Sequence, residues 1–359
     1  MSSIERNVAV DVLRGLAIVI MIIVDAPPDF EVTYPLLLHS EWEGITLADL
    51  AFPGFVFTMG ASATYSISRR QNEPLEVRLI RVLRRTLILF MLGLIFNIVP
   101  EMISGAEWNL RVFGILQRLA LTYAVGMVII NVLRQEKLIL IAAFMLLIIS
   151  AAGFHIYAPT APFDKMHNIS QALDLLIPGA VHCYQYYGLP FEPEGLYGTF
   201  SSAALMLFGA IAGSFEMRKA RRLLPVAGVI LLVIGLMWSR IDIISKPLWT
   251  APFTLINAGA DIIVLAIITW LMRRVPRAKM LLSPFQAFGT NPLLFFMATN
   301  FALIMLRAID GDLYLRVWRS TIEGFISPAF SAALYSVIWC LLWLPLAEFL
   351  FKSRFIVKI

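Results

Sequence analysis

The chain has 359 residues, of which 59% are hydrophobic and only 15% are charged, and its mean hydropathy is +0.80. A soluble domain is typically about 45–50% apolar and about 25% charged, so the composition excludes an ordinary soluble protein. The formal net charge of +5 is compatible with nucleic-acid binding, but the basic residues gather in alternate loops, which is a signal of membrane topology. We therefore expect no nucleic-acid partner and a lipid bilayer around most of the chain.

The apolar residues fall into blocks, most of them long enough to cross a hydrocarbon core of about 30 Å. Because lipid offers no hydrogen bonds to the backbone, each block is expected to be a helix. The predicted fold is an all-α, polytopic helical bundle that forms one transmembrane domain over residues 1–359. The ten predicted spans lie near residues 8–25, 46–67, 86–99, 111–133, 138–155, 196–215, 224–239, 250–272, 287–308 and 329–350.

Lysine and arginine follow the second, sixth, eighth and last spans, whereas the loop 26–45 contains neither. Because basic residues mark cytoplasmic loops, both termini are expected to be cytoplasmic. The segments near 26–45, 156–195 and 309–328 are then extracytoplasmic loops. The first block lacks a small-residue cleavage site, so we expect it to remain as the first span.

The densest polar cluster lies where the second span begins. A histidine, His39, is followed within eleven residues by Glu41, Glu43, Thr46 and Asp49, and the last of these lies inside an apolar block. Ionisable residues at membrane depth are costly and usually mark function. A purely structural interpretation is also open, because Thr46-x-x-Asp49 resembles a helix capping box with aspartate in place of glutamate or glutamine.

The residues around His39 also follow a long and specific pattern. Its members are His39, Trp42, Gly44, Thr46, Ala48, Asp49, Phe52, Pro53, Phe55, Phe57 and Gly60. This pattern resembles the heparan-α-glucosaminide N-acetyltransferase family, a lysosomal membrane enzyme and its bacterial relatives.

Further segments resemble motifs of the same family in the same order along the chain. They are Asp11-Val-Leu-Arg14-Gly15, the run from Arg111 to Gln117-Arg118-Leu119, Glu192-Pro-Glu194-Gly195, Lys246-Pro-Leu-Trp249-Thr250 and Gly289-Thr-Asn291. The resemblance covers essentially the whole chain and lacks only the lumenal N-terminal extension of the animal enzyme. It implies a protein of a bacterial inner membrane, and the animal relatives suggest a homodimer.

The resemblance implies that an acetyl group passes from cytoplasmic acetyl-CoA to the amine of an extracytoplasmic glucosamine-type sugar. The catalytic histidine of the family corresponds to His39. An imidazole with a pKa near 6.5 can take the proton of an attacking amine at physiological pH, or it can accept the acetyl group first. Both routes stay open, and no metal is expected.

The remaining site residues are assigned by the same resemblance and by their chemistry. Asp25 and Asp49 are expected to assist His39. Phosphates need cationic partners, and the residues expected to bind acetyl-CoA are Arg14, Gln117, Arg118 and Asn291. Those expected to bind the sugar are Trp42, Glu43, Glu194 and Trp249. The cluster of Arg81, Arg84 and Arg85 is expected to serve topology and to attract anionic lipid, at about 1 kcal/mol per residue.

Three positions depart from the family pattern and leave the acceptor sugar open. The family has asparagine where this chain has Asp25 and Glu43, and a carboxylate beside His39 would raise its pKa and orient its ring. Asp261 lies in the middle of the eighth predicted span. It is expected either to contact a proton or substrate, or to be hydrogen-bonded to Asn257 or a neighbouring helix. Two rival functions are a proton-coupled sugar transporter and a catalytically silent membrane scaffold or sensor.

Overall fold

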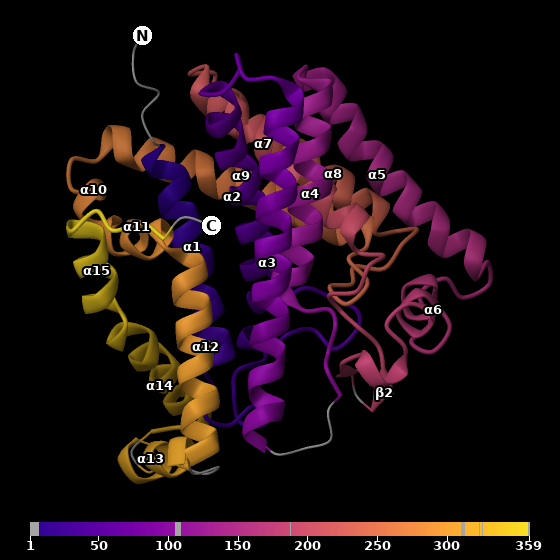
Figure 1. The fold of residues 1–359 in the computed structure, drawn as a ribbon. Coiled ribbons are helices and arrows are strands. Elements are labelled where there is room, and N and C mark those ends of the chain that lie inside the picture. The colour runs from indigo at the N-terminus through magenta and orange to yellow at the C-terminus, as the bar shows by residue number, and fades with distance from the viewer. Residues whose placement is uncertain are drawn as a thin grey trace.

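The computed structural model describes residues 7–104, 109–186, 188–309, 313–322, 324 and 326–357. Helices make up most of this part of the chain (Figure 1). The longer ones are α1 (Val8–Asp25), α2 (Ala48–Ser68), α3 (Leu75–Ser104), α4 (Ile115–Leu133), α5 (Glu136–Tyr157), α7 (Thr199–Met217), α8 (Leu223–Trp238), α9 (Ala251–Arg274), α12 (Pro292–Ile309) and α14 (Pro328–Leu342). The shorter ones are η1 (Pro35–Leu37), α6 (Ile169–Leu176), η2 (Ala180–His182), α10 (Ala278–Leu281), α11 (Ser283–Thr290), α13 (Leu313–Thr321) and α15 (Leu344–Lys352). Strands β1 (Gln185–Tyr186) and β2 (Leu189–Pro190) form a small antiparallel pair.

Within the described residues, six segments are long and apolar enough to cross a bilayer: α3, α4, α5, α7, α9 and the joined α14–α15. The pair α11 and α12, bent by 85°, is a seventh if it forms one span. The prediction of an all-α membrane protein is thus confirmed. The other predicted spans coincide with α1, α2 and α8, which are shorter or more polar, so the count of ten and the cytoplasmic termini stay predictions.

The third predicted span is wrong in its starting point. The apolar block predicts a start near residue 86, but α3 already begins at Leu75, so that Arg81, Arg84 and Arg85 lie on a helix and not in a loop. Arginine and leucine both favour helices, and long basic side chains can lie along apolar surface with the charge in water. The predicted outer loops also contain structure, namely α6 and the β1–β2 pair in one and α13 in another. Residues 310–312, 323 and 325 of the predicted loop 309–328 lie outside the described residues.

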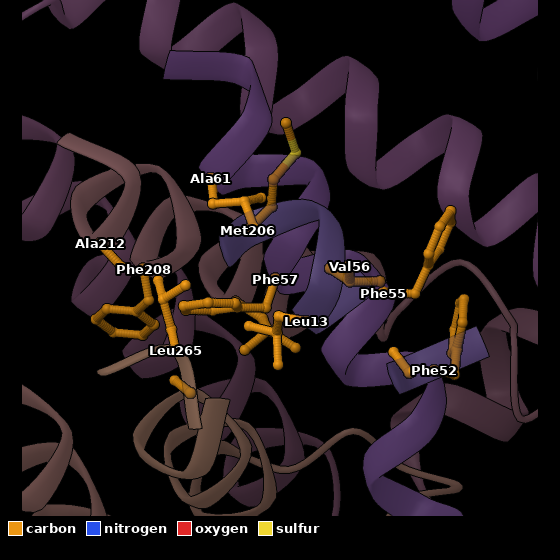
Figure 2. Close-up of a cluster of buried hydrophobic side chains, with 14 of the residues drawn as sticks. Leu13, Phe52, Phe55, Val56, Phe57, Ala61, Met206, Phe208, Ala212 and Leu265 are labelled. Carbon is orange, nitrogen blue, oxygen red and sulfur yellow. The ribbon is translucent and has the colours of Figure 1, made fainter. Parts of the chain in front are cut away.

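The centre of the bundle is the contact of α2 with α7. Figure 2 shows the apolar side chains around it, with Phe57 of α2 and Phe208 of α7 among them. The two backbones touch directly, because a Cβ on Gly60 would lie 1.8 Å from the carbonyl oxygen of Met206, and one on Gly209 would lie 2.0 Å from that of Phe57. Such close approach through small residues is typical of helix packing in membranes. It holds α2, and therefore the Asp49 end of that helix, directly against α7.

The bundle has two distinct ends. At one end the loop 26–47 meets the loop 239–250 through a hydrogen bond from the Gly44 N–H to the Ile244 carbonyl, 2.8 Å long. At the other end Asn7 and Val357, near the two termini, line a common cavity with Arg69. We call these the His39 end and the arginine-rich end.

Candidate active site

His39 lies at the start of α2 and contacts Asp49. The Nδ1 atom of His39 is 2.9 Å from Oδ1 of Asp49. The histidine side chain is 44% exposed, whereas the aspartate side chain is wholly buried. When a carboxylate accepts from Nδ1–H, the lone pair of the imidazole is on Nε2. The exposed ring can therefore act as a base or nucleophile through Nε2.

The other oxygen of Asp49 is held by the loop that carries His39. Oδ2 accepts from the backbone N–H of Ser40 at 3.2 Å, from the N–H of Thr46 at 3.0 Å and from the Thr46 hydroxyl at 3.1 Å. The predicted capping box is half formed: Asp49 Oδ2 accepts from the Thr46 N–H, but the Asp49 N–H donates to the backbone carbonyl of Thr46 at 3.2 Å and not to its hydroxyl. The Thr46 hydroxyl also donates to the Leu38 carbonyl at 2.6 Å. Asp49 thus closes the start of α2 and orients His39 at once.

Lys246 is a cation of this site that sequence analysis did not assign. Its Nζ lies 3.9 Å from Oδ1 of Asp49, and its side chain is only 14% exposed. Burial lowers the pKa of Lys246, although Glu194, Asp49 and Asp25 oppose the shift. A lysine inside the otherwise apolar run Lys246-Pro-Leu-Trp249 was the available signal, but only the fold shows that it faces Asp49.

The other acids near His39 lie at different depths. Asp25, the last residue of α1, accepts from Asn300 Nδ2 at 3.4 Å and interacts electrostatically with His39, Lys246 and Glu194. Glu43 is exposed. The carboxylate that orients the ring is therefore Asp49, and not Glu43 as the departure from the family pattern suggested, because the loop turns the Glu43 side chain outward. The assignment of Glu43 to the sugar stays a prediction.

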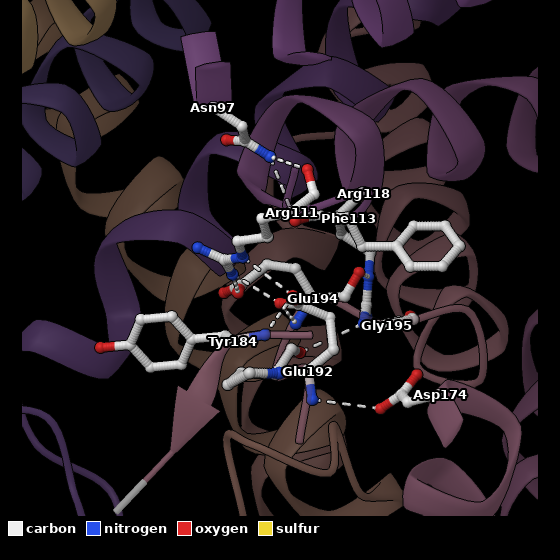
Figure 3. Close-up of polar contacts among 10 residues, drawn as sticks. Asn97, Arg111, Phe113, Arg118, Asp174, Tyr184, Glu192, Glu194 and Gly195 are labelled. Carbon is white, nitrogen blue, oxygen red and sulfur yellow. Dashed lines mark hydrogen bonds and ion pairs between the residues drawn. The ribbon is translucent and has the colours of Figure 1, made fainter. Parts of the chain in front are cut away.

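A second polar cluster braces the loop that carries Glu194 (Figure 3). Arg111 Nε donates to Glu192 Oε2, and Arg111 Nη2 donates to Glu194 Oε2, each at 2.8 Å. Burial raises the pKa of Glu192. Burial also acts on Glu194, but there Arg111 and Lys246 outweigh it and hold the pKa of the carboxyl below its ordinary value. Glu194 is therefore a buried carboxylate, and Lys246 links it electrostatically to Asp49.

Arg118 holds the same loop through hydrogen bonds to its backbone carbonyls. Its Nη2 donates to the carbonyls of Gly195 at 2.6 Å and Pro193 at 3.2 Å, and its guanidinium lies over the ring of Trp249, 5.3 Å from the centroid. Gln117, its neighbour on α4, is fully buried. Both residues lie at the His39 end and not beside Arg14, so the four residues predicted to bind acetyl-CoA do not form one group.

The two tryptophans predicted to bind the sugar are covered by protein. Trp42 Nε1 donates to the Phe163 carbonyl at 2.8 Å, and its ring meets that of Phe191 at 5.3 Å. Trp249 is 1% exposed and meets the edge of Phe52 at 5.6 Å. Their contacts give both rings a supporting role in the wall of the site, and their contact with a sugar stays a prediction.

A cavity of about 800 Å³ opens at the arginine-rich end. Its basic lining residues are Arg14, Arg69, Arg70, Arg81, Arg84 and Arg85, and its deeper apolar lining includes Phe55, Met59, Leu119 and Tyr123. Along α2 the lining runs from Arg69 to Phe55, which is about 21 Å at 1.5 Å per residue. Phe55 is six residues, or about 9 Å, from Asp49. The cavity thus leads from the arginines toward the His39 end.

Two of the predicted acetyl-CoA residues line this cavity. Arg14 donates to the Gly289 carbonyl at 3.1 Å and to Ser62. Asn291, at the break between α11 and α12, donates to the Phe355 carbonyl at 2.8 Å and accepts from the Val357 N–H at 2.9 Å. Asn291 thereby fixes the end of the described chain beside the cavity.

The arginines set aside in the sequence analysis line the cavity as well. Arg81, Arg84 and Arg85 come from consecutive turns of α3, and Arg85 lies 4.5 Å from the ring centroid of Tyr123. Their spacing of three and four residues, which puts side chains on one face of a helix, was a usable signal. The signal applies only to a helix, and the composition of this segment also fits a polar loop.

Of the two structural partners expected for Asp261 of α9, Asn257 and a neighbouring helix, the structure excludes Asn257. The side-chain nitrogen of Asn257 donates to the Phe253 carbonyl at 2.9 Å, so Asn257 is not the partner of Asp261. Instead Asp261 lies against α2, where a Cβ on Gly54 would be 3.2 Å from its Oδ1.

The sequence model of the family described as "Heparan-alpha-glucosaminide N-acetyltransferase, catalytic" matches residues 6–243. The chain belongs to this family. Among curated relatives, the heparan-alpha-glucosaminide N-acetyltransferase of Mus musculus is 27% identical over 59% of this chain and 39% of its own length. The Homo sapiens protein of the same name is 27% identical over 57% of this chain and 38% of its own length. The chain thus spans about two fifths of the length of these relatives.

The resemblance to the heparan-alpha-glucosaminide N-acetyltransferase family is therefore confirmed. The matched residues include His39, Asp49, Arg111, Arg118 and Glu194. Lys246, Trp249 and Asn291 lie beyond the matched stretch, and their place in the site comes from the structure.

Proposed function

We propose that this chain is a transmembrane N-acetyltransferase that moves an acetyl group from acetyl-CoA to the amine of a glucosamine-type sugar. The observation that carries the proposal is the pair of His39 and Asp49. A buried carboxylate on Nδ1 fixes the tautomer and orientation of an imidazole whose Nε2 is free to react, which is the arrangement that general-base and nucleophilic histidines need.

Either of two reactions can follow from this pair. In a direct transfer, His39 Nε2 takes the proton of the attacking amine while the C–N bond forms, and the C–S bond breaks as the thiol of CoA leaves with a proton. In a two-step transfer, Nε2 attacks the thioester carbonyl, the C–S bond breaks and CoA leaves as its thiolate. The amine then attacks the acetyl group, the Nε2–C bond breaks to restore the imidazole, and the proton lost by the amine matches the one taken up by the thiolate. Asp49 serves both, because the carboxylate stabilises the positive charge that develops on the ring.

The donor is proposed to enter at the arginine-rich end. Guanidinium groups bind phosphates through paired hydrogen bonds, and Arg81, Arg84 and Arg85 stand at the basic part of the 800 Å³ cavity. Its apolar part, with Phe55 and Leu119, suits the less polar arm that carries the thioester. Since this cavity and His39 lie toward opposite ends of α2, donor and acceptor would reach the imidazole from opposite sides of the membrane, with both termini on the cytoplasmic side.

The acceptor is proposed to lie at the His39 end, among Asp25, Glu194 and Lys246. A carboxylate can hold the ammonium form of an amino sugar, and the same groups can bind its hydroxyls. Asp25 stands where the family has asparagine, so the acceptor of this chain is expected to differ in charge or size from a heparan end. A cytoplasmic membrane of a bacterium remains the proposed location.

The test is acetyl transfer by the full chain in sealed vesicles, with labelled acetyl-CoA and a panel of amino sugars, and with products identified by mass spectrometry. His39→Ala is expected to abolish labelled product. His155→Ala is a matched control, because His155 Nε2 also meets a buried aspartate, Asp242, at 2.7 Å, while its ring packs on Phe163 and does not contact Asp49. Full turnover by the His39 variant would overturn the proposal, and uptake of unmodified sugar without acetyl-CoA would favour a transporter.

A further inference from the structure

A second cavity of about 460 Å³ lies among the ends of α2, α3, α4, α5 and α7. It shares no lining residue with the 800 Å³ cavity at the arginine-rich end, which we call the donor cavity. One part of its wall is apolar, with Ile67, Ile130 and Ile139, and another part is polar, with Gln71, Asn72 and Arg78. A cavity that is apolar on one side and cationic on another suits a ligand with an apolar part and an anionic part.

Arg78 is the residue that indicates the charge of the ligand. It is 5% exposed, and its Nε and Nη2 atoms have no hydrogen-bond partner among the described residues. A buried cation without a partner is costly. The acid in the lining, Glu136, does not neutralise it, because the Glu136 carboxylate accepts from Arg218 and Ser214. Two donors on one edge of a guanidinium that lines the cavity thus have no partner among the described residues.

We propose that this cavity binds the phosphate of an anionic phospholipid, with the acyl chain against the isoleucines. A guanidinium binds phosphate oxygens through paired, charge-assisted hydrogen bonds. Basic pockets between transmembrane helices on the cytoplasmic side are known to take anionic headgroups, and the arginine-rich end is that side by the positive-inside rule. The amides of Gln71 and Asn72 can bind the remaining headgroup oxygens. Free phosphate would leave the isoleucine wall without a partner.

The test measures lipid binding to the purified full chain by native mass spectrometry. The probes are phosphatidylglycerol, phosphatidylcholine, diacylglycerol and inorganic phosphate. Phosphatidylglycerol is expected to bind in preference to the others, and Arg78→Gln is expected to weaken it about ten-fold or more, since hydrogen bonds to a charged group contribute strongly. The matched control is Arg222→Gln, which removes an exposed arginine at the same end and is expected to leave binding unchanged.

A second pair of variants covers the case in which Arg78→Gln does not fold. Arg78→Lys keeps the charge and is expected to keep most of the preference for phosphatidylglycerol. Ile139→Trp fills the cavity and is expected to lose it while Arg78 is intact. The proposal is overturned if Arg78→Gln or Ile139→Trp binds this lipid as the unchanged protein does, if phosphatidylcholine binds equally well, or if inorganic phosphate alone is retained.

Discussion

Asp49 divides its two oxygens between two tasks, and this division makes the residue hard to replace. Oδ1 receives His39 Nδ1, and Oδ2 receives the N–H groups of Ser40 and Thr46. All of these partners are donors, so only a group with two acceptor oxygens satisfies them. An asparagine would place an NH₂ group against a donor on one side or the other.

Asp49→Asn is therefore expected to lower kcat for acetyl transfer by about 10²–10⁴, the usual contribution of an oriented general base. Steady-state kinetics with labelled acetyl-CoA measures the effect. The matched control is Asp29→Asn, an acid of the same loop that accepts from the Glu31 N–H and does not contact His39. Equal kcat in both variants would show that Asp49 does not orient the ring.

At this scale, sequence analysis predicted the residues but not how they pair. His39 and Asp49 were both assigned from the family pattern, and the capping-box interpretation of Asp49 was also half right. Which acid meets the histidine depends on how the loop 38–47 folds back onto α2. Lys246, about two hundred residues along the chain, could not be placed beside Asp49 without the packing of the whole bundle.

Among the elements, the contact of α2 with α7 leaves no space for a side chain at Gly60. Gly60→Ala would put a methyl group 1.8 Å from a backbone oxygen, which cannot move without shifting α7. We expect a loss of stability at the upper end of the 1–3 kcal/mol that overpacking costs, measured as a lower melting temperature in detergent.

The matched control for Gly60→Ala is Gly126→Ala on α4. There the added methyl group meets the Met206 sulfur at 2.5 Å, and a methionine side chain can move aside. The idea fails if the two variants melt alike.

Helix α6 carries a pH-sensitive carboxyl. Asp174 of α6 is buried, its Oδ2 accepts from the Glu192 N–H at 3.2 Å, and burial raises its pKa to about 8, with Glu192 and Glu194 adding to the shift. Between about pH 4 and pH 8 the unfolded chain has lost this proton while the folded protein keeps it. Stability should therefore fall as pH rises through that window and level off above it.

Asp174→Asn is expected to flatten this dependence, since an amide does not titrate. Hydrogen exchange of residues 174–195 between pH 5 and pH 9 measures it. An unchanged slope in the variant would assign the pH effect to other groups.

The elements themselves were largely predictable, for a physical reason. Each predicted span coincides with a helix or a pair of helices, because a bilayer demands apolar length and internal backbone hydrogen bonds. The start of α3 was missed, because a charged amphipathic turn and a polar loop have similar compositions. The helix break at Asn291 was predictable from Gly289 and Pro292 and is confirmed, whereas its angle of 85° required the structure.

At the scale of the whole molecule, the 800 Å³ cavity proposed to bind the acetyl donor is lined by arginines at one end and by apolar side chains further in. Arg81→Gln together with Arg84→Gln is expected to raise KM for acetyl-CoA about ten-fold with little change in kcat, since these residues would bind the phosphates equally in ground and transition states. The rise should shrink at high salt, which screens exposed charges.

Arg222→Gln serves again as the control for lost positive charge at the arginine-rich end. The role of the cavity is contradicted if KM stays constant in the double variant while kcat falls. Because this cavity combines residues from α1, α2, α3, α4 and α12, no local sequence pattern could have predicted its shape.

The direct backbone contact between α2 and α7 has a mechanical consequence. The backbones of α2 and α7 approach each other closely at Gly60 and Gly209. The two helices should therefore resist sliding, because a shift would bring carbonyl oxygens against Cα atoms. Asp49, which contacts His39, lies in the first turn of α2, so we expect its position to stay fixed. If the chain binds a sugar as proposed, we expect the opening for it to form in the surrounding loops, because the contact at Gly60 and Gly209 leaves no room for a shift of α2 against α7.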